Sequence, residues 1–192
     1  MLKRHQRWPA ILALFATALL ATPAIHAQQS ADWTLARADG SEFSLKDNRG
    51  EKTTLVLFWA TWCPYCKALM PHLESLVLEH SPDDFEIVAI TIGEDGDPAS
   101  FLKKKGYDFT LLPDGEKVAA IYGVRGTPGV LIFNERSELV FDLRKQPSQT
   151  LDTEGMKRRD VAARRAPFWA AQIRGALDAT LIERPAPDAS SD

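Results

Sequence analysis

The chain has 192 residues, 26 acidic and 23 basic, and 45% of its residues are hydrophobic, so its formal net charge is −3. Removal of residues 1–27, the leader described next, takes away three basic and no acidic residues and leaves a net charge of −6. This acidic balance argues against a general nucleic-acid-binding role. The remaining length of about 165 residues is sufficient for one domain with a full hydrophobic core.

Residues 1–27 have the pattern of a secretory signal peptide. Three basic residues form a positive start, an apolar run covers residues 11–20, and small residues around Ala27 provide a cleavage position. The apolar run is short for a membrane span, although an uncleaved inner-membrane anchor stays open as the alternative. The segment has no cysteine, which excludes a lipoprotein. We therefore expect export to an oxidising compartment, the bacterial periplasm.

The first structural signal after the leader is a β-hairpin. Residues 33–35 and 42–44 have strand character and flank Asp39-Gly40, a dipeptide that favours a tight hairpin turn. Residues 44–47 then predict a single helical turn. These elements precede the main body of the domain.

The only two cysteines, Cys63 and Cys66, lie where a predicted strand meets a predicted helix. Residues 53–60 form an apolar, β-branched and aromatic run that is typical of a buried strand. Residues 67–78 predict a helix, because apolar side chains recur at helical spacing on one face. These side chains are Leu69, Leu73, Leu76 and Val77.

The position of the cysteines has a chemical consequence. Unpaired N–H groups and the dipole at a helix N-terminus favour negative charge, so they lower the pKa of a thiol. A free thiol has a pKa near 8.5, and the first cysteine of such motifs has one of roughly 3.5–7.5. We therefore expect Cys63 to be a thiolate nucleophile at neutral pH. Cys66, one turn further on, should be shielded and able to close a disulfide with it.

Further elements are predicted in chain order as a strand over 85–92, a helix over 99–105, an extended piece over 109–112, a helix over 116–122, and strands over 130–133 and 139–143. The first of these strands is apolar along most of its length, which is continuous enough to be typical of a central parallel strand. The last two read as an antiparallel pair.

The C-terminal part begins with a polar, basic insertion at residues 144–165, which we interpret as a solvated loop or frayed helix. A docking surface for an acidic partner or for lipid headgroups is the alternative. A closing helix is expected over residues 167–181, with Trp169 on its apolar side. Residues 183–192 are rich in Pro, Ala and Ser and are predicted to be a disordered tail.

Three segments together resemble thioredoxin-fold proteins. Phe58–Cys66 resembles the active-site segment, Pro71 matches the helix-kinking proline, and Gly126–Val130 resembles the cis-proline loop. Over residues 33–143 the chain is similar to the bacterial extracytoplasmic TlpA/ResA-like thiol-disulfide oxidoreductases.

This resemblance implies an α/β, thioredoxin-like domain over residues 31–182. It implies a central mixed sheet flanked by helices, an N-terminal β-hairpin, and a TlpA/ResA-type central insertion over residues 93–122.

The resemblance also implies roles for individual residues. Cys63 and Cys66 would be catalytic. Glu94 matches the position of an active-site glutamate in ResA-like proteins and would act as the general base for Cys66, the alternative being an ordinary loop carboxylate. Substrate would be bound by Trp62, Pro64, Tyr65, Thr127 and Pro128.

The Thr127–Pro128 bond is a candidate cis peptide, because cis peptides are essentially confined to X-Pro and the chain reads Gly-Thr-Pro-Gly before a predicted strand. By resemblance, a cis bond would direct the backbone of Thr127 at the substrate, which would pair with it as an added strand. An ordinary trans-proline turn is the alternative.

The implied function is thiol-disulfide exchange with no cofactor beyond a redox-active Cys63–Cys66 disulfide. A purely structural disulfide is disfavoured because a bridge across two residues constrains little unfolded chain. Zinc is disfavoured because two cysteines alone cannot supply a four-ligand site. Tyr65 stands where the strongest oxidants carry a histidine, which favours the reducing direction.

The expected protein is thus a monomeric periplasmic reductase of disulfides in exported proteins, with cytochrome c maturation as one setting. By resemblance, a membrane thiol transporter of the DsbD/CcdA type would re-reduce it. Three alternatives stay open: a DsbA-like oxidant, a copper-binding assembly factor, and a non-catalytic thioredoxin-fold adaptor.

Overall fold

The computed structural model describes residues 31–183, so the expected leader (1–27) and the tail from residue 184 lie outside the described residues. The elements are β1 (Thr34–Ala36), β2 (Glu42–Ser44), β3 (Thr53–Trp59), α1 (Pro64–Glu79), β4 (Phe85–Thr91), α2 (Pro98–Lys105), β5 (Thr110–Leu112), α3 (Glu116–Ile121), β6 (Gly129–Phe133), β7 (Leu139–Asp142), a 3-10 turn (Leu143–Lys145) and α4 (Arg158–Ile182).

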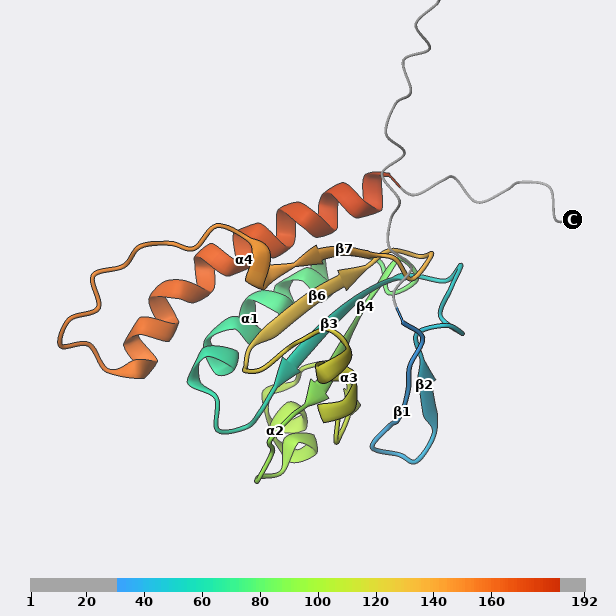
Figure 1. Cartoon of the computed structure of the whole chain (residues 1–192), viewed down its shortest axis with the longest axis horizontal. Helices are drawn as coiled ribbons and strands as arrows, with labels where there is room; N and C mark the ends of the chain where they lie inside the picture. The colour runs from blue at the N-terminus through green and yellow to red at the C-terminus, as the bar shows by residue number, and fades with distance from the viewer. Residues whose placement is uncertain (1–30, 184–192) are drawn as a thin grey trace, which may run out of the picture.

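A five-stranded sheet in the order β5-β4-β3-β6-β7 forms the centre of the molecule (Figure 1). β3, β4 and β5 run parallel to one another, whereas β6 is antiparallel to β3 and β7 is antiparallel to β6. β1 and β2 pair as the predicted antiparallel hairpin. The mixed sheet and its flanking helices confirm the expected thioredoxin-like α/β fold.

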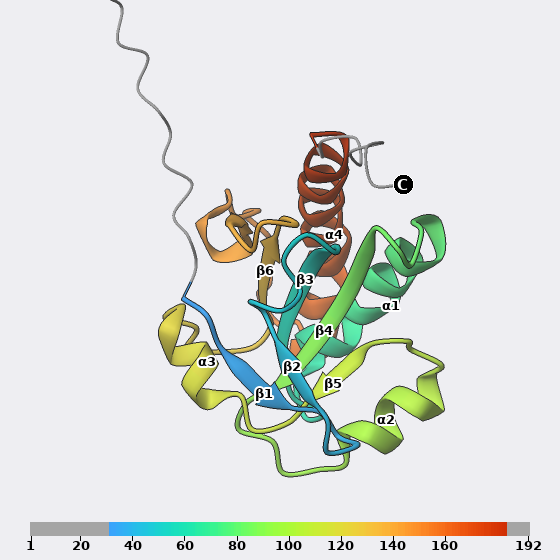
Figure 2. The same cartoon turned by 90° about the vertical axis from the view of Figure 1, so that its right-hand side faces the viewer.

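The two faces of the sheet are covered by different elements, as Figure 2 shows from the side. Side chains of a strand alternate between faces, so Leu55 and Leu57 pack with α1 and α4, while Val56 and Phe58 pack with α3 and the hairpin. Both faces of β3 are therefore buried, which explains why its sequence is a continuous apolar run instead of an alternating one.

The closing helix is longer than predicted. α4 begins at Arg158 instead of Pro167, and Pro167 lies inside it. Pro167 suggested a helix start because proline is well tolerated in the first turn. The apolar stripe extends further upstream, however, since Val161, Ala162 and Ala166 are all buried. Residues 158–165, expected to be loop or frayed helix, are thus the first turns of α4.

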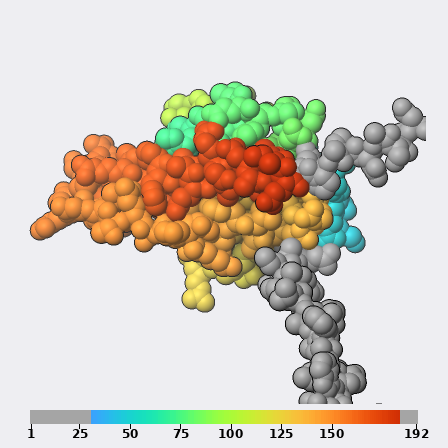
Figure 3. Space-filling model, turned by 90° about the horizontal axis from the view of Figure 1, so that it is seen from above, coloured from blue at the N-terminus to red at the C-terminus, as the bar shows by residue number. Residues whose placement is uncertain are grey.

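The strand pairing brings three loops together at one edge of the sheet. Phe58 pairs with Gly129 and Trp59 pairs with Thr91. The segment after β3, the segment after β4 and the loop before β6 therefore meet at this edge. In the view of Figure 3, α4 forms a long ridge, and its N-terminal end and the preceding loop project beyond the rest of the molecule.

Within residues 31–183, no helix combines the length and apolar character needed to cross a bilayer.

Candidate active site

The two cysteines lie at the N-terminus of α1, as the sequence predicted. Cys63 is the N-cap, and its Sγ accepts a hydrogen bond of 3.1 Å from the backbone N–H of Cys66. Pro64 occupies the first position of the helix, where the missing N–H has no intrahelical partner to lose. Both cysteines are free thiols, with exposed fractions of 1% and 0%. Cys66 is shielded as expected, and Cys63 is nearly as well covered.

The surroundings of the two thiols separate their pKa values. The pKa of Cys63 is lowered to about 6, first by a hydrogen bond from the Cys66 thiol, then by the Thr127 hydroxyl and by backbone N–H groups at the helix start, while burial opposes the shift. The pKa of Cys66 is raised, first by burial and then by its hydrogen bond to Cys63 and the charge there. At neutral pH, Cys63 is therefore mostly a thiolate and Cys66 keeps its proton.

The Thr127–Pro128 peptide bond is cis. It lies directly before β6, whose first residue, Gly129, packs closely against β3. A Cβ at Gly129 would lie 2.7 Å from Val124 and 3.4 Å from Phe58, so only glycine fits without a shift of its neighbours. This close packing brings Thr127 to the cysteine pair, where its hydroxyl lowers the pKa of both thiols.

Thr127 lines two hollows, each of which also includes a residue of the cysteine motif. One, of about 300 Å³, is lined by Trp62, Ile92, Gly93, Glu116, Ala119, Val124, Arg125, Gly126 and Thr127. The other, of about 320 Å³, is lined by Tyr65, Thr127, Pro128, Arg165 and Trp169. Of the five residues expected to bind substrate, four thus line these hollows. The fifth, Pro64, begins α1 between Cys63 and Tyr65.

Trp62 is the most exposed aromatic residue at the site, with an exposed fraction of 52%. Its indole N–H donates a 2.7 Å hydrogen bond to the carbonyl of Gly93. The loop after β4 therefore holds the ring beside the cysteines, where a bound polypeptide can pack on it.

Glu94 is tied to the same turn, but through Thr61. Its carboxylate accepts hydrogen bonds from the backbone N–H of Thr61 at 2.7 Å and from the Thr61 hydroxyl at 2.5 Å. It also accepts bonds from the N–H groups of Asp95 and Gly96. These hydrogen bonds lower the pKa of Glu94 despite its partial burial. Among the described residues it bonds to neither sulfur, so its role as general base stays a prediction.

Arg144 supports the loop that leads to Thr127. Its guanidinium binds both carboxylate oxygens of Asp142, at 2.9 and 2.7 Å, and donates to the carbonyls of Tyr122 and Gly123. Asp142 is buried, with an exposed fraction of 5%. The pair therefore links β7 to the end of α3, from which the chain continues toward the cis-proline loop.

Sequence reasoning missed Arg165 and Trp169 as site residues, because both were assigned to structural or solvated segments. Their spacing of one helical turn was the available signal, since residues i and i+4 share a helix face. The rings of Tyr65 and Trp169 lie 5.9 Å apart, which brings α4 directly to the cysteine motif.

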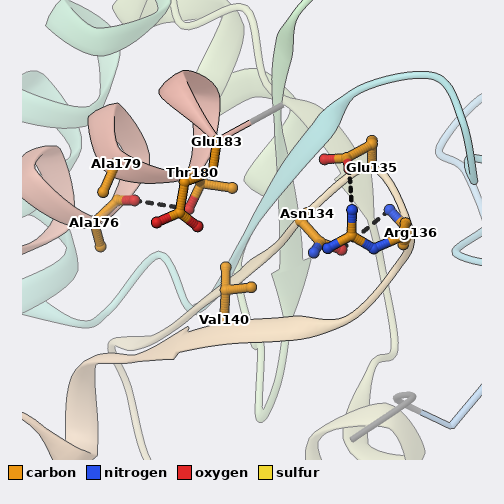
Figure 4. A pocket seen from close by; sticks show the side chains of 8 residues that line it. All are labelled: Asn134, Glu135, Arg136, Val140, Ala176, Ala179, Thr180 and Glu183. Atoms are coloured by element: carbon orange, nitrogen blue, oxygen red, sulfur yellow. Dashed lines mark hydrogen bonds and ion pairs between the residues drawn. The ribbon is translucent and has the colours of Figure 1, made fainter. Parts of the chain in front are cut away.

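A separate pocket of about 210 Å³ lies at the opposite end of the sheet, between the β6–β7 turn and the C-terminal end of α4 (Figure 4). Asn134, Arg136 and Thr180 are among the residues that line it. Asn134 follows β6, whereas Thr127 precedes it, so this pocket is remote from the cysteines. Within residues 31–183, no three His, Cys, Asp or Glu side chains are grouped so that they could hold a metal ion.

Comparisons with known proteins agree with this geometry. A sequence profile of the AhpC/TSA family matches residues 27–145. The thiol-disulfide oxidoreductase ResA of Halalkalibacterium halodurans is 34% identical over 153 residues, which cover 72% of this chain and 86% of that protein. The thioredoxin-like protein YneN of Bacillus subtilis is 32% identical over 137 residues, which cover 66% of this chain and 79% of that protein.

Among solved structures, an uncharacterized conserved protein from Geobacillus kaustophilus superposes with a TM-score of 0.63 at 25% sequence identity. The superposition covers 84% of each chain.

Proposed function

Because this chain belongs to the AhpC/TSA family and is a thiol-disulfide oxidoreductase, we propose that it acts as a reductase of disulfides in exported proteins. One observation carries the direction of the reaction, namely a Cys63 pKa of about 6. The first thiol has a pKa of roughly 3.5 in the strong oxidant DsbA and roughly 7 in thioredoxin. A less acidic thiol stabilises the reduced form less, so the dithiol gives up its electrons more readily.

The source of the low pKa supports the same direction. The groups that lower the pKa of Cys63 are a thiol, a hydroxyl and backbone N–H groups, and none of them carries a positive charge. The nearest basic residue in the sequence is Lys67, whose Nζ lies 5.7 Å from the centre of the Phe101 ring. Tyr65, between the cysteines, is neutral. No cation is thus among the groups that stabilise the Cys63 thiolate.

The reaction begins when the Cys63 thiolate attacks one sulfur of a substrate disulfide. The substrate S–S bond breaks, its second sulfur leaves as a thiolate that takes up a proton, and a mixed disulfide with Cys63 forms. Cys66 then loses its proton and attacks Sγ of Cys63. The mixed disulfide breaks, the second substrate thiol is released, and the Cys63–Cys66 disulfide remains. Two electrons have moved from the protein to the substrate, and of the two protons that the substrate thiols gain, Cys66 accounts for one and the solvent for the other.

The timing of the second step follows from the pKa of Cys66. Part of the increase in that pKa comes from the hydrogen bond to Cys63 and from its charge. Both influences weaken once the Cys63 sulfur is engaged in a mixed disulfide, so the Cys66 proton becomes easier to remove when it has to leave. Glu94 is the proposed acceptor of this proton.

The cellular setting completes the proposal. The pattern of residues 1–27 supports export to the periplasm, with an uncleaved anchor as the alternative form. There the protein would work as a monomer and would be re-reduced by a membrane thiol transporter of the DsbD/CcdA type. Apocytochrome c cysteines are one candidate substrate.

A measurement of the reduction potential tests the direction. The protein is equilibrated with glutathione buffers, and the fluorescence of Trp62 next to Cys63 reports the redox state. We expect a potential below the roughly −120 mV of DsbA, toward the roughly −270 mV of thioredoxin. A value at or above that of DsbA would refute the reductase assignment and favour an oxidant.

A further inference from the structure

The first turns of α4 extend the active site on the side of Tyr65. α4 packs beside α1, and its N-terminal end reaches past the edge of the sheet (Figure 1). Trp169 and Arg165 lie one turn apart on this part of α4, and both line the hollow next to Pro128. Because Tyr65 and Thr127 line the same hollow, a polypeptide that reaches Cys63 from this side must pass Arg165.

Arg165 has no charged or hydrogen-bonding partner among residues 31–183. It is half-buried in the hollow. Some arginines of the domain are neutralised by carboxylates, as Arg144 is by Asp142 and Arg174 by Glu79. The exposed Arg125, Arg158 and Arg164 have no ion pair among the described residues either, but only Arg165 combines this with partial burial in a hollow next to the cysteine motif. No carboxylate lines the hollow. Its wall therefore presents an unpaired positive charge beside two aromatic rings.

We propose that this hollow binds an acidic side chain of the substrate polypeptide close to its reactive cysteine. The proposal rests on the proposed function and adds a preference for substrate sequence. An extended substrate that pairs with the backbone of Thr127 would cross between the two hollows. On one side it meets the largely apolar hollow at Trp62, where Arg125 is accompanied by the carboxylate of Glu116, and on the other it meets Arg165, which no carboxylate accompanies. Arginine is suited to this role because its planar guanidinium binds a carboxylate through two parallel hydrogen bonds.

A lipid surface is the other ligand that arginines at this end of α4 could bind. The structure favours the polypeptide, because Arg165 is half-buried in a concave hollow that shares Tyr65 and Thr127 with the cysteine site. The acidic balance of the chain also opposes adsorption to an anionic membrane.

The test uses the reduced full-length protein and disulfide-linked dimers of a short peptide with one cysteine. In separate peptides, a single Asp or Asn is placed at each of the two positions before and the two positions after the cysteine. The rate of the first exchange is measured by acid quench and alkylation. We expect one position at which the Asp peptide reacts about fivefold faster than the Asn peptide, which is the effect of a partly exposed ion pair. This ratio should decrease in high salt.

Variants of α4 identify the residue responsible. In Arg165→Gln, the ratio of the Asp to the Asn rate should fall to about one, while Arg165→Lys should keep part of it because it keeps the charge. Arg164→Gln is the matched control. Arg164 is the exposed neighbour of Arg165 and lines neither hollow, so the ratio should stay as in the wild type.

Three results would overturn the proposal. The first is equal reaction of the Asp and Asn peptides at every position. The second is a preference for Asp that survives in Arg165→Gln. The third is a wild-type protein that shows no peptide preference but co-sediments with phosphatidylglycerol vesicles, while Arg165→Gln does not. This result would make this end of α4 a membrane-binding surface. If the wild type reduced none of the peptides, the reductase function itself would be refuted together with this inference.

Discussion

Replacement of Cys66 by alanine tests how the pKa of Cys63 is lowered. The thiol of Cys66 is the strongest of the groups that bring this pKa to about 6. A hydrogen bond to a charged group contributes about 1.5–3 kcal/mol, and one pKa unit corresponds to about 1.36 kcal/mol. Loss of the donor should therefore raise the pKa of Cys63 by about 1–2 units in Cys66→Ala.

The assay is the pH dependence of alkylation by iodoacetamide, whose rate follows the thiolate fraction. Because Cys66→Ala has a single thiol, the midpoint of the profile belongs to Cys63 alone. Cys66→Ser is the matched control, since its hydroxyl can still donate to the thiolate, and its midpoint should stay closer to about 6. If both variants titrate at the same pH near 6, the hydrogen bond from Cys66 is not the cause of the shift, and the reasoning fails.

Three other predictions follow from the same structure. The reduction potential should fall by about 59 mV per pH unit below a pH of about 6 and by about 30 mV per pH unit above it. Reduction of the disulfide takes up two protons when Cys63 becomes a thiol but only one when it becomes a thiolate. A single slope through this pH would contradict the lowered pKa of Cys63. Arg144→Met should lower the free energy of unfolding in urea by about 1.5–3 kcal/mol, because Asp142 stays buried without its partner. Arg136→Met, at an exposed ion pair, should lower the free energy of unfolding by less than about 1 kcal/mol. If both variants lowered it equally, burial of the Asp142–Arg144 pair would not contribute the expected stability. Glu94→Gln should slow the resolving step about a hundredfold, seen as accumulation of mixed disulfides, and an unchanged rate would leave Glu94 without a role as base.

Much of the fold was predictable from short-range patterns. The continuous apolar run of residues 53–60 identified a buried strand, and Asp39-Gly40 identified the hairpin. Both signals are local, because strand character and turn geometry depend on residues within a few positions of one another. The position of Cys63 at a helix start was predictable for the same reason.

The start of α4 was less predictable, since two local signals conflicted. Pro167 favoured a helix start, while the apolar stripe through Val161 and Ala166 favoured an earlier one. The free energy gained by packing this stripe against the rest of the domain is larger than the cost of the one backbone hydrogen bond that Pro167 removes. The sequence pattern of one segment does not show this packing, because the residues that the stripe contacts lie elsewhere in the chain.

The amino-acid sequence by itself thus determined the class of chemistry, since a strand that leads into a helix-capping Cys63 already predicts an acidic thiol. Only the tertiary structure decided its surroundings. It brought Thr127 to both sulfurs and the Glu94 carboxylate into hydrogen bonds with Thr61. It also placed Arg165 in the hollow next to Pro128. These residues are far apart in the chain, and their contacts exist only after the sheet has paired β3 with β6 and α4 has packed on it. Hydrogen bonds and charge pairs depend on distances of a few ångströms, which no periodicity in a sequence encodes.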